Sequence, residues 1–284
     1  MKIAVAQTEI ILEAPEKNLA AAEAWITQAA AARADCIFFP EMSFSGFSMH
    51  VDEMASYAEK ISAEMRRLAQ AHQIAVGYGK ITRTPEGKGE NHYLLVDKNG
   101  GLLSDYVKIH PFSYGGEDQF YSSGKEIVHA ALGDFSVSTL ICYDLRFPEL
   151  FRAAAQKSRL IVVPANWLHQ RSAHWQLLLR ARAIENQVYV LGVNCVGKQQ
   201  TYRFDGQSCL CDPEGNLRCV CGSAPELAFV TIDNDTEQYR RDFPTCRDVK
   251  LPFYTELYQN LDRKGPNHDR SISTASGNTE TDSI

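Results

Sequence analysis

Apolar and polar residues follow two different periods along the chain, and these periods predict a mixture of strands and helices. Residues 2–7 form a short apolar strand, and Pro15 then opens a stretch in which apolar residues recur at helix spacing. Residues 36–39 are apolar throughout, which is typical of a strand buried on both faces. The chain therefore begins with a predicted strand, helix and strand, and the second strand stops at Pro40-Glu41.

The same alternation continues through the middle of the chain. Helices are predicted near residues 52–72, 148–157 and 172–187, and strands near 74–82, 93–96, 102–107, 135–141, 160–163 and 188–194. Asn99-Gly100 between two apolar runs is a strong hairpin signal. Residues 212–215, Asp-Pro-Glu-Gly, form a second predicted turn. Hairpins among alternating strands and helices predict an α/β sandwich of mixed β-sheets rather than a purely parallel doubly wound fold.

The end of the chain has a different composition. After about Lys264 the residues are mostly Gly, Asn, Ser, Thr and Asp, with almost no apolar side chains. Such a segment cannot bury enough apolar surface to fold. We find no internal repeat and no linker, so we predict one domain over residues 1–263 and a disordered polar tail over residues 264–284.

Composition and charge narrow the class of protein. The chain has 284 residues, of which 44% are hydrophobic and 23% charged, as in ordinary soluble domains. The net charge of −6 gives no support for a nucleic-acid or anionic membrane partner. No apolar stretch approaches the roughly 20 residues of a membrane helix, and no signal peptide follows Met1. We therefore expect a cytoplasmic protein whose eight cysteines are reduced.

Three predicted strands each deliver a reactive side chain at the carboxyl end, namely Glu41, Lys108 and Cys142. Ligand sites in α/β sheets collect at these ends, so the three groups are expected to converge. A nearby cation lowers the pKa of a thiol, and a carboxylate can take the thiol proton and later deliver it to a departing amine. An ammonium and the backbone N–H of Tyr143 can stabilise the oxyanion. The triple predicts nucleophilic attack on a carbonyl and a thioester intermediate.

Each of the three residues also has a structural interpretation. A cysteine after an apolar strand is often a small core residue, Lys108 could be a solvated strand end, and Glu41 could cap a loop. Taken alone, each residue type is usually structural. The surrounding motifs favour the catalytic interpretation.

Those motifs resemble the nitrilase superfamily of carbon–nitrogen hydrolases. The matching segments are Phe39-Pro40-Glu41, which resembles the general-base segment, Tyr106 to His110, which resembles the catalytic-lysine segment, Cys142 to Glu149, which resembles the nucleophile motif, and residues 164–167 and 180–187. The resemblance runs from residue 2 to about residue 255. It implies a four-layer αββα sandwich of mixed β-sheets (nitrilase-like), an amide substrate, no cofactor and a homodimer.

The resemblance also implies a fourth catalytic residue. Many members of the family place a second glutamate beside the first, and Gly115-Gly116-Glu117 lies where that residue is expected. Glu117 would then orient Lys108, the substrate or a water molecule. The alternative is a polar loop residue next to Asp118.

Residues 142–147 and 166–175 look most like the omega-amidase branch, whose members hydrolyse terminal amides of short alpha-keto dicarboxylate monoamides. The same segments place Asn166 and Trp167 in the substrate pocket. The substrate carboxylate would need a cation, and the candidates are Arg146, Arg171 and His169. A salt bridge of Arg146 with Asp144 or Glu149 is an equally good interpretation. Only residues 113–119, at the border of the pocket, depart from this branch.

Other enzyme classes fit the sequence less well. An N-carbamoyl amine or amino-acid amidohydrolase would use the same Cys-Glu-Lys site, and a true nitrilase ranks after it. A catalytically inactive binding member of the family is a further alternative. Papain-like chemistry would need His110, His169 or His174, but nothing around Cys142 resembles that family. Residues 46–50 differ from the Gly-x-Ser-x-Gly motif of serine hydrolases at the last position. Residues 77–81 lack the spacing of the Walker phosphate-binding loop.

Four cysteines flank the second predicted hairpin turn and suggest a metal site. Alternate residues of a strand share a face, so the thiols of Cys209, Cys211, Cys219 and Cys221 could gather on one side. Structural zinc, however, prefers two to four residues between paired cysteines. We therefore expect ordinary strand packing and no metal.

Overall fold

The computed structural model describes residues 1–264. Contacts divide the chain into one unit over Met1–Cys246 and a second unit over Arg247–Ile284, whose described part is mainly helix α8 (Leu251–Lys264). The predicted tail lies outside the described residues except for its first residue. The disordered tail and the single domain over residues 1–263 both stay predictions.

The first unit contains a mixed sheet of six strands. Its order is β14-β1-β2-β3-β4-β5, in which β1, β2 and β3 are parallel and the outer strands are antiparallel to their neighbours. The bounds are β1 (Lys2–Gln7), β2 (Cys36–Phe38), β3 (Ala75–Arg83), β4 (Gly89–Val96), β5 (Leu102–Val107) and β14 (Glu226–Thr231).

A second six-stranded sheet repeats the same scheme, in the order β13-β12-β9-β8-β7-β6 with β7, β8 and β9 parallel. The bounds are β6 (His129–Leu132), β7 (Phe135–Thr139), β8 (Leu160–Ala165), β9 (Tyr189–Asn194), β12 (Cys209–Cys211) and β13 (Leu217–Val220). Strands β10 (Val196–Gln199) and β11 (Tyr202–Asp205) form a separate ribbon.

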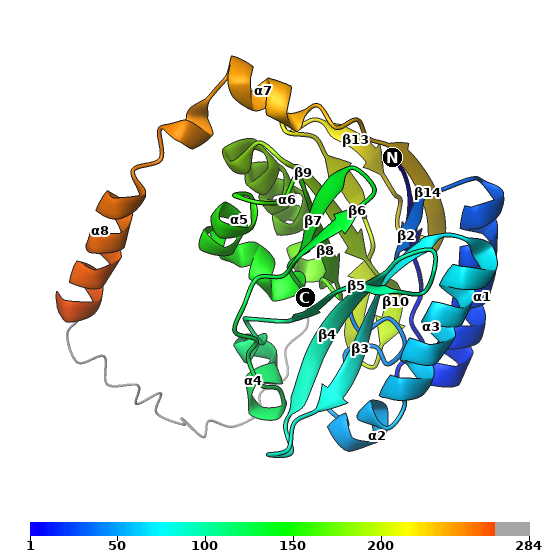
Figure 1. The fold of residues 1–284 in the computed structure, drawn as a ribbon. Helices are drawn as coiled ribbons and strands as arrows, with labels where there is room; N and C mark the ends of the chain where they lie inside the picture. The colour runs from blue at the N-terminus through cyan, green and yellow to red at the C-terminus, as the bar shows by residue number, and fades with distance from the viewer. Residues whose placement is uncertain (265–284) are drawn as a thin grey trace, which may run out of the picture. The chain divides into compact units, whose positions relative to one another are not determined.

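Helices cover the outer faces of both sheets (Figure 1). Helices α1 (Pro15–Ala31) and α3 (Ala58–His72) lie on the first sheet, and α5 (Pro148–Ala154) and α6 (Ser172–Asn186) lie on the second. The short elements are α2 (Val51–Ala55), α4 (Glu117–Phe120), α7 (Thr236–Asp242) and the 3₁₀ turns η1 (Ser113–Gly115), η2 (Cys142–Arg146), η3 (His169–Arg171) and η4 (Thr245–Arg247). Within residues 1–264, no helix is long and apolar enough to cross a membrane.

Strand β1 shows why the central strands are apolar on both faces. Ile3 and Val5 belong to the core between the two sheets, whereas Ala4 and Ala6 belong to the core beneath α1 and α3. Neighbouring residues of a strand point to opposite faces, so a strand covered on both sides must be apolar throughout. Contacts of β1 with β9 and of β5 with β6 bring the sheets face to face. The predicted αββα sandwich is confirmed.

The structure departs from the sequence prediction at several elements. The helix predicted near residues 52–72 is two helices, α2 and α3, separated at Ser56-Tyr57, where the Ser56 hydroxyl donates a hydrogen bond to the Glu53 carbonyl. The strand predicted to reach Cys142 ends at Thr139. Strands β6, β10, β11 and β14 and helices α7 and α8 were not predicted, because several of these short elements are half exposed and show no strong apolar period.

Candidate active site

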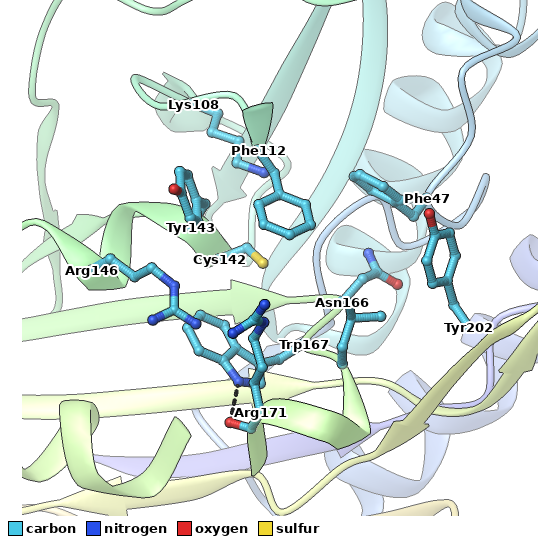
Figure 2. A pocket seen from close by; sticks show the side chains of 11 residues that line it. Phe47, Lys108, Phe112, Cys142, Tyr143, Arg146, Asn166, Trp167, Arg171 and Tyr202 are labelled. Atoms are coloured by element: carbon cyan, nitrogen blue, oxygen red, sulfur yellow. Dashed lines mark hydrogen bonds between the residues drawn. The ribbon is translucent and has the colours of Figure 1, made fainter. Parts of the chain in front are cut away.

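The predicted reactive groups lie at the ends of strands. Lys108 follows β5 directly, Glu41 follows β2 after a short turn, and Cys142 opens η2 shortly after β7. Lys108 and Cys142 line the same pocket, and Figure 2 shows the sulfur pointing into its interior. Glu117, the first residue of α4, approaches from a different element. The fold therefore brings together groups that are far apart in the sequence.

The bottom of the pocket holds a cluster of buried polar groups. Lys108 Nζ donates hydrogen bonds to Glu41 Oε1 at 2.7 Å and to Glu117 Oε2 at 2.8 Å. Asn91 Nδ2 donates to Glu41 Oε1 at 2.8 Å and to Glu117 Oε1 at 3.2 Å. All four side chains are at most 1% exposed. We refer to Glu41, Asn91, Lys108 and Glu117 as the floor of the pocket.

Asn166 holds the base from a second side. Its backbone N–H donates to Glu41 Oε2 at 2.9 Å, and its Nδ2 donates to the Glu41 carbonyl at 2.8 Å. Its Oδ1 accepts hydrogen bonds from Cys195 and Gln199. Asn166 lines the pocket as predicted, but all its side-chain polar atoms bond to protein groups. Its contribution in the structure is therefore to fix Glu41, and the predicted substrate contact stays a prediction.

The charges of the floor follow from burial and pairing. Burial raises the pKa of Glu41, but the Lys108 ammonium and the hydrogen bonds from Asn166 and Asn91 outweigh burial, so the pKa is lowered overall. Burial raises the pKa of Glu117; Lys108 opposes this shift and the charge of Glu41 adds to it. Burial acts to lower the pKa of Lys108, but the two carboxylates raise it well above its ordinary value. Glu41 is therefore a carboxylate and Lys108 an ammonium at neutral pH.

The thiol of Cys142 behaves differently from the sequence prediction. Burial and the charge of Glu41 raise its pKa well above the ordinary value, and the opposing effect of Lys108 is smaller. The expectation that a nearby cation would give a lowered thiol pKa was therefore wrong, because the sequence did not show how deeply the sulfur is buried. A neutral thiol beside a carboxylate needs that carboxylate to remove its proton.

Cys142 sits on a tight turn that Asp144 supports. The φ angle of Cys142 is 45°, in the left-handed region that non-glycine residues rarely adopt. Asp144 is fully buried, and its Oδ2 accepts hydrogen bonds from the Ile141 N–H at 2.9 Å and the Tyr106 hydroxyl at 2.8 Å. Its Oδ1 accepts the N–H of His110 at 3.0 Å. Since Tyr106 lies in β5 and His110 just after it, Asp144 ties the nucleophile turn to that strand.

Tyr143 is the second residue of η2. The first N–H groups of a helix have no intrahelical acceptor, so the N–H of Tyr143 is available beside the sulfur. This is the position that the sequence assigned to an oxyanion donor. The Tyr143 ring lines the pocket.

Two arginines lie at the mouth of the pocket, and we call Arg146 and Arg171 the rim. The guanidinium of Arg146 lies 4.8 Å from a ring centroid of Trp167, and that of Arg171 lies 5.3 Å from the ring centroid of Tyr114. Burial and the charge of Arg171 lower the pKa of Arg146. Within residues 1–264 neither guanidinium pairs with a carboxylate. The alternative that Arg146 forms a salt bridge with Asp144 is therefore wrong, because the carboxylate oxygens of Asp144 have other partners.

Aromatic side chains form much of the pocket wall (Figure 2). The lining includes Phe47, Phe112, Tyr143, Trp167 and Tyr202. Trp167 is held by its backbone N–H, which donates to Asn194, and by its indole N–H, which donates to the Arg171 carbonyl at 2.8 Å. Trp167 lines the pocket, and its predicted contact with the substrate stays a prediction. An aromatic lining with a few polar groups is typical of a small-molecule site.

The histidines considered as partners for Cys142 have other neighbours. His110 Nδ1 lies 2.9 Å from Asp144 Oδ1, His174 Nδ1 lies 3.5 Å from Arg146 Nη2, and His169 Nδ1 is hydrogen-bonded to Asp205. No hydrogen bond joins any of the three to Cys142 within the described part of the chain. Because His169 already bonds to the carboxylate of Asp205, it is a weaker candidate than the arginines for binding a substrate carboxylate.

The four cysteines of the second hairpin do not gather on one face. In the β12–β13 ladder Cys209 pairs with Val220, and Leu210 pairs with Cys219. Paired residues of an antiparallel ladder point to the same side, so Cys209 and Cys219 face opposite sides. Across residues 1–264, no group of three or more His, Cys, Asp or Glu side chains is placed to hold a metal ion.

Comparison with known proteins gives a consistent result. The family model described as carbon-nitrogen hydrolase matches residues 2–241. An omega-amidase YafV of Yersinia enterocolitica is 34% identical over 76% of this chain and 84% of its own length. A 2-oxoglutaramate amidase of Bacillus subtilis is 29% identical over 89% of this chain and 98% of its own length.

A solved structure gives the same result for the fold. A CN-hydrolase superfamily protein of Xanthomonas campestris, with an arsenic adduct in its active site, is 27% identical and superposes with a TM-score of 0.83. The match covers 88% of this chain and 97% of the other.

Proposed function

The chain belongs to the carbon–nitrogen hydrolase family and is an amidase of the nitrilase superfamily, and on this premise we propose its catalytic residues and its substrate class. Cys142 is the nucleophile, Glu41 the general base and acid, and Lys108 the cation at the oxyanion. The substrate is a small molecule with a terminal amide and a carboxylate, such as an alpha-keto dicarboxylate monoamide. Hydrolysis proceeds through a thioester and releases ammonia.

One observation carries the proposal. A single pocket is lined by a thiol, an ammonium and two guanidinium groups that have no acidic partner among the described residues. The thiol and the ammonium suit an amide carbonyl, and the guanidinium groups suit a carboxylate. The aromatic walls fit a short carbon chain.

In the first half of the reaction, Cys142 Sγ attacks the amide carbon while Glu41 takes the thiol proton. The C=O π electrons move to the oxygen, which becomes an oxyanion. Lys108 has three N–H groups; one is donated to Glu41 and one is shared by the two oxygens of Glu117, which leaves the third for the oxyanion. The Tyr143 N–H is the second donor. Glu41 then gives its proton to the amide nitrogen, the C–N bond breaks, and ammonia leaves.

In the second half a water molecule attacks the thioester. Glu41, again a carboxylate, takes a proton from the water as the C–O bond forms. The tetrahedral intermediate collapses, the C–S bond breaks, and the sulfur recovers a proton from Glu41. The product is a carboxylic acid. Glu117 keeps Lys108 charged and in place throughout, since both of its carboxylate oxygens accept hydrogen bonds from the ammonium.

The rim supplies the proposed specificity. Arg146 and Arg171 lie close enough for the charge of one to affect the other, so an anion between them would relieve their repulsion. A guanidinium binds a carboxylate in a bidentate geometry. The names of the two curated relatives, an omega-amidase and a 2-oxoglutaramate amidase, support the same substrate class.

The test is ammonia release from a panel of amides, comprising keto-acid monoamides, glutamine, N-carbamoyl amines and simple nitriles. We expect the keto-acid monoamides to have the highest kcat/KM, and Cys142→Ala to abolish turnover with folding intact. Mass spectrometry should trap an acyl group on Cys142. Cys219→Ser, on the distant hairpin, is the matched control and should keep full activity.

Three outcomes would contradict the proposal. Turnover by Cys142→Ala would remove Cys142 as the nucleophile. Release of carbon dioxide with ammonia from N-carbamoyl amines as the preferred substrates would favour the carbamoyl amidohydrolase. A chain that releases no ammonia from any substrate would favour an inactive binding member of the family.

A further inference from the structure

Asn91 is the one floor residue that carries no charge and that sequence motifs did not identify. It lies in β4 opposite Ile81 of β3, and its side chain is 1% exposed. Its Nδ2 reaches both acids of the floor. Its backbone carbonyl accepts the N–H of Lys108 at 2.9 Å. One residue therefore contacts the backbone of the lysine and the side chains of both its partners.

The charges around the two acids are unbalanced. Glu41 and Glu117 face a single ammonium, that of Lys108. The other titratable groups near them are the thiols of Cys142 and Cys195 and the hydroxyl of Tyr121, none of which is a cation. Within residues 1–264 no second Lys, Arg or His forms an ion pair with either acid. The raised pKa of Glu117 reflects burial and this imbalance, and neutral N–H donors to the carboxylates reduce the imbalance.

We propose that Asn91 is a positioning residue that bridges Glu41 and Glu117, so that Glu41 stays a carboxylate facing the thiol and Lys108 stays between the two acids. The inference rests on the proposed function, in which Glu41 must accept the proton of Cys142. A hydrogen bond to an ionised carboxylate favours the ionised form. An aspartate at this position would add a third negative charge, whereas an amide supplies donors without changing the net charge.

The orientation of the amide supports this role. Asn91 Oδ1 is buried and has no hydrogen-bond partner among the described residues. Rotation of the amide by half a turn would place this oxygen against the two carboxylates, where three acceptors would meet without a proton. The observed orientation leaves one acceptor unpaired but keeps both acids bonded. A buried acceptor without a partner destabilises the fold, so stability alone does not explain an asparagine here.

The pKa shifts agree with the geometry. The hydrogen bond from Asn91 is one of the interactions that lower the pKa of Glu41. Loss of this donor should therefore raise that pKa, and the acid limb of the pH–rate profile should move to higher pH. A residue that only filled space in β4 would leave the limb where it is.

The test compares kcat/KM as a function of pH for the parent and for Asn91→Leu, which has a similar volume and no donor. We expect kcat near neutral pH to fall about 10- to 100-fold and the acid limb to rise by about one pH unit. Asn91→Ser keeps one donor and should lie between the two. Asn91→Ser also carries the test if the leucine variant does not fold.

Asn186 provides a matched control in α6. It is fully buried, its Nδ2 donates to the Arg182 carbonyl, and its Oδ1 also has no partner within residues 1–264. Asn186→Leu should change thermal stability at most and leave the acid limb in place. An acid limb in Asn91→Leu and Asn91→Ser that coincides with that of the parent would overturn the inference.

A second readout needs no substrate. The rate at which iodoacetamide alkylates Cys142, followed by peptide mass spectrometry, should depend on the ionisation of Glu41 beside it. We expect the midpoint of this dependence to move to higher pH in Asn91→Leu, in the same direction as the acid limb. If the parent hydrolyses no amide, the proposed function fails, and the alkylation midpoint still decides the role of Asn91. An unchanged midpoint in both Asn91 variants would reject that role.

Discussion

In the floor of the pocket every charged group has an oppositely charged partner, since two acids share the ammonium of Lys108, whereas in the rim two guanidinium groups face the cavity without an acidic partner among the described residues. Lys108 and its two acids are at most 1% exposed, and both acids accept hydrogen bonds from Lys108. Arg146 and Arg171 contact aromatic rings instead. Groups with fixed internal partners suit the chemistry common to all amides. Groups that lack a partner suit the recognition of one substrate.

The two regions should also differ in what they contribute to stability. A buried charge that loses its partner destabilises the fold, because desolvation is no longer offset. A partly exposed arginine that stacks on a ring contributes little to stability when it is removed. Mutations in the floor should thus affect activity and folding together, and mutations in the rim should affect substrate binding alone.

The largest expected effect follows from Lys108→Met, which leaves Glu41 and Glu117 buried without a cation. We expect kcat to fall by about 10³-fold or more and the free energy of unfolding to fall by about 3–5 kcal/mol. Steady-state kinetics and urea denaturation measure the two quantities. Lys60→Met, which breaks the exposed pair with Glu16, is the control and should resemble the parent. An active, stable Lys108→Met would remove the proposed contrast between floor and rim.

Glu41→Gln should have the next largest effect, because the amide keeps the shape of the side chain but cannot accept the thiol proton. We expect kcat to fall about 10²- to 10⁴-fold. In the parent, the lowered pKa of Glu41 means that the carboxylate persists as pH falls to its ordinary value of 4.5 and is protonated only below that value. Activity that depends on the Glu41 carboxylate should therefore persist down to about that pH and fall below it. This acid limb of the pH–rate profile should be absent in Glu41→Gln. A rate within about threefold of the parent would exclude Glu41 as the base.

Substitutions in the rim should have the smallest effect and should sharpen the contrast. We expect Arg171→Gln and Arg146→Gln each to raise KM for a keto-acid monoamide about 10-fold, with kcat nearly unchanged, through loss of a charge-assisted hydrogen bond. KM for an uncharged amide should not change. Thermal unfolding of both variants should match the parent. Equal losses for charged and uncharged amides would assign the arginines to the structure of the pocket.

Much of the fold and the three central residues could be predicted from the sequence, because both depend on local signals. Buried parallel strands have continuous apolar runs, so β1, β2 and β8 were placed almost to the residue. The segments ending at Glu41 and Lys108 and beginning at Cys142 carry specific motifs. Short, half-exposed strands such as β10 and β14 carry no comparable signal.

The support of the site could not be predicted, because it depends on contacts between distant segments. Asn91 stands between Glu90 and His92, just before the strand predicted from residue 93, so no apolar pattern marks it as buried. Asn166 was expected to contact the substrate, and only the fold shows that its amide holds Glu41. The raised pKa of Cys142 depends on how deeply its neighbours bury the sulfur. None of these properties is visible in a motif.

The bond network of Asp144 has a consequence for how a ligand reaches the sulfur. Because Asp144 joins the turn of Cys142 to β5 and its extension, these two walls move as one piece. At the outer end of this segment Tyr114 is 78% exposed and contacts Phe112 and Arg171 through its ring, so we expect access to the pocket at this lip. Rotation of side chains at that lip should therefore control how substrate enters and product leaves. The reacting atoms should keep their alignment between turnovers.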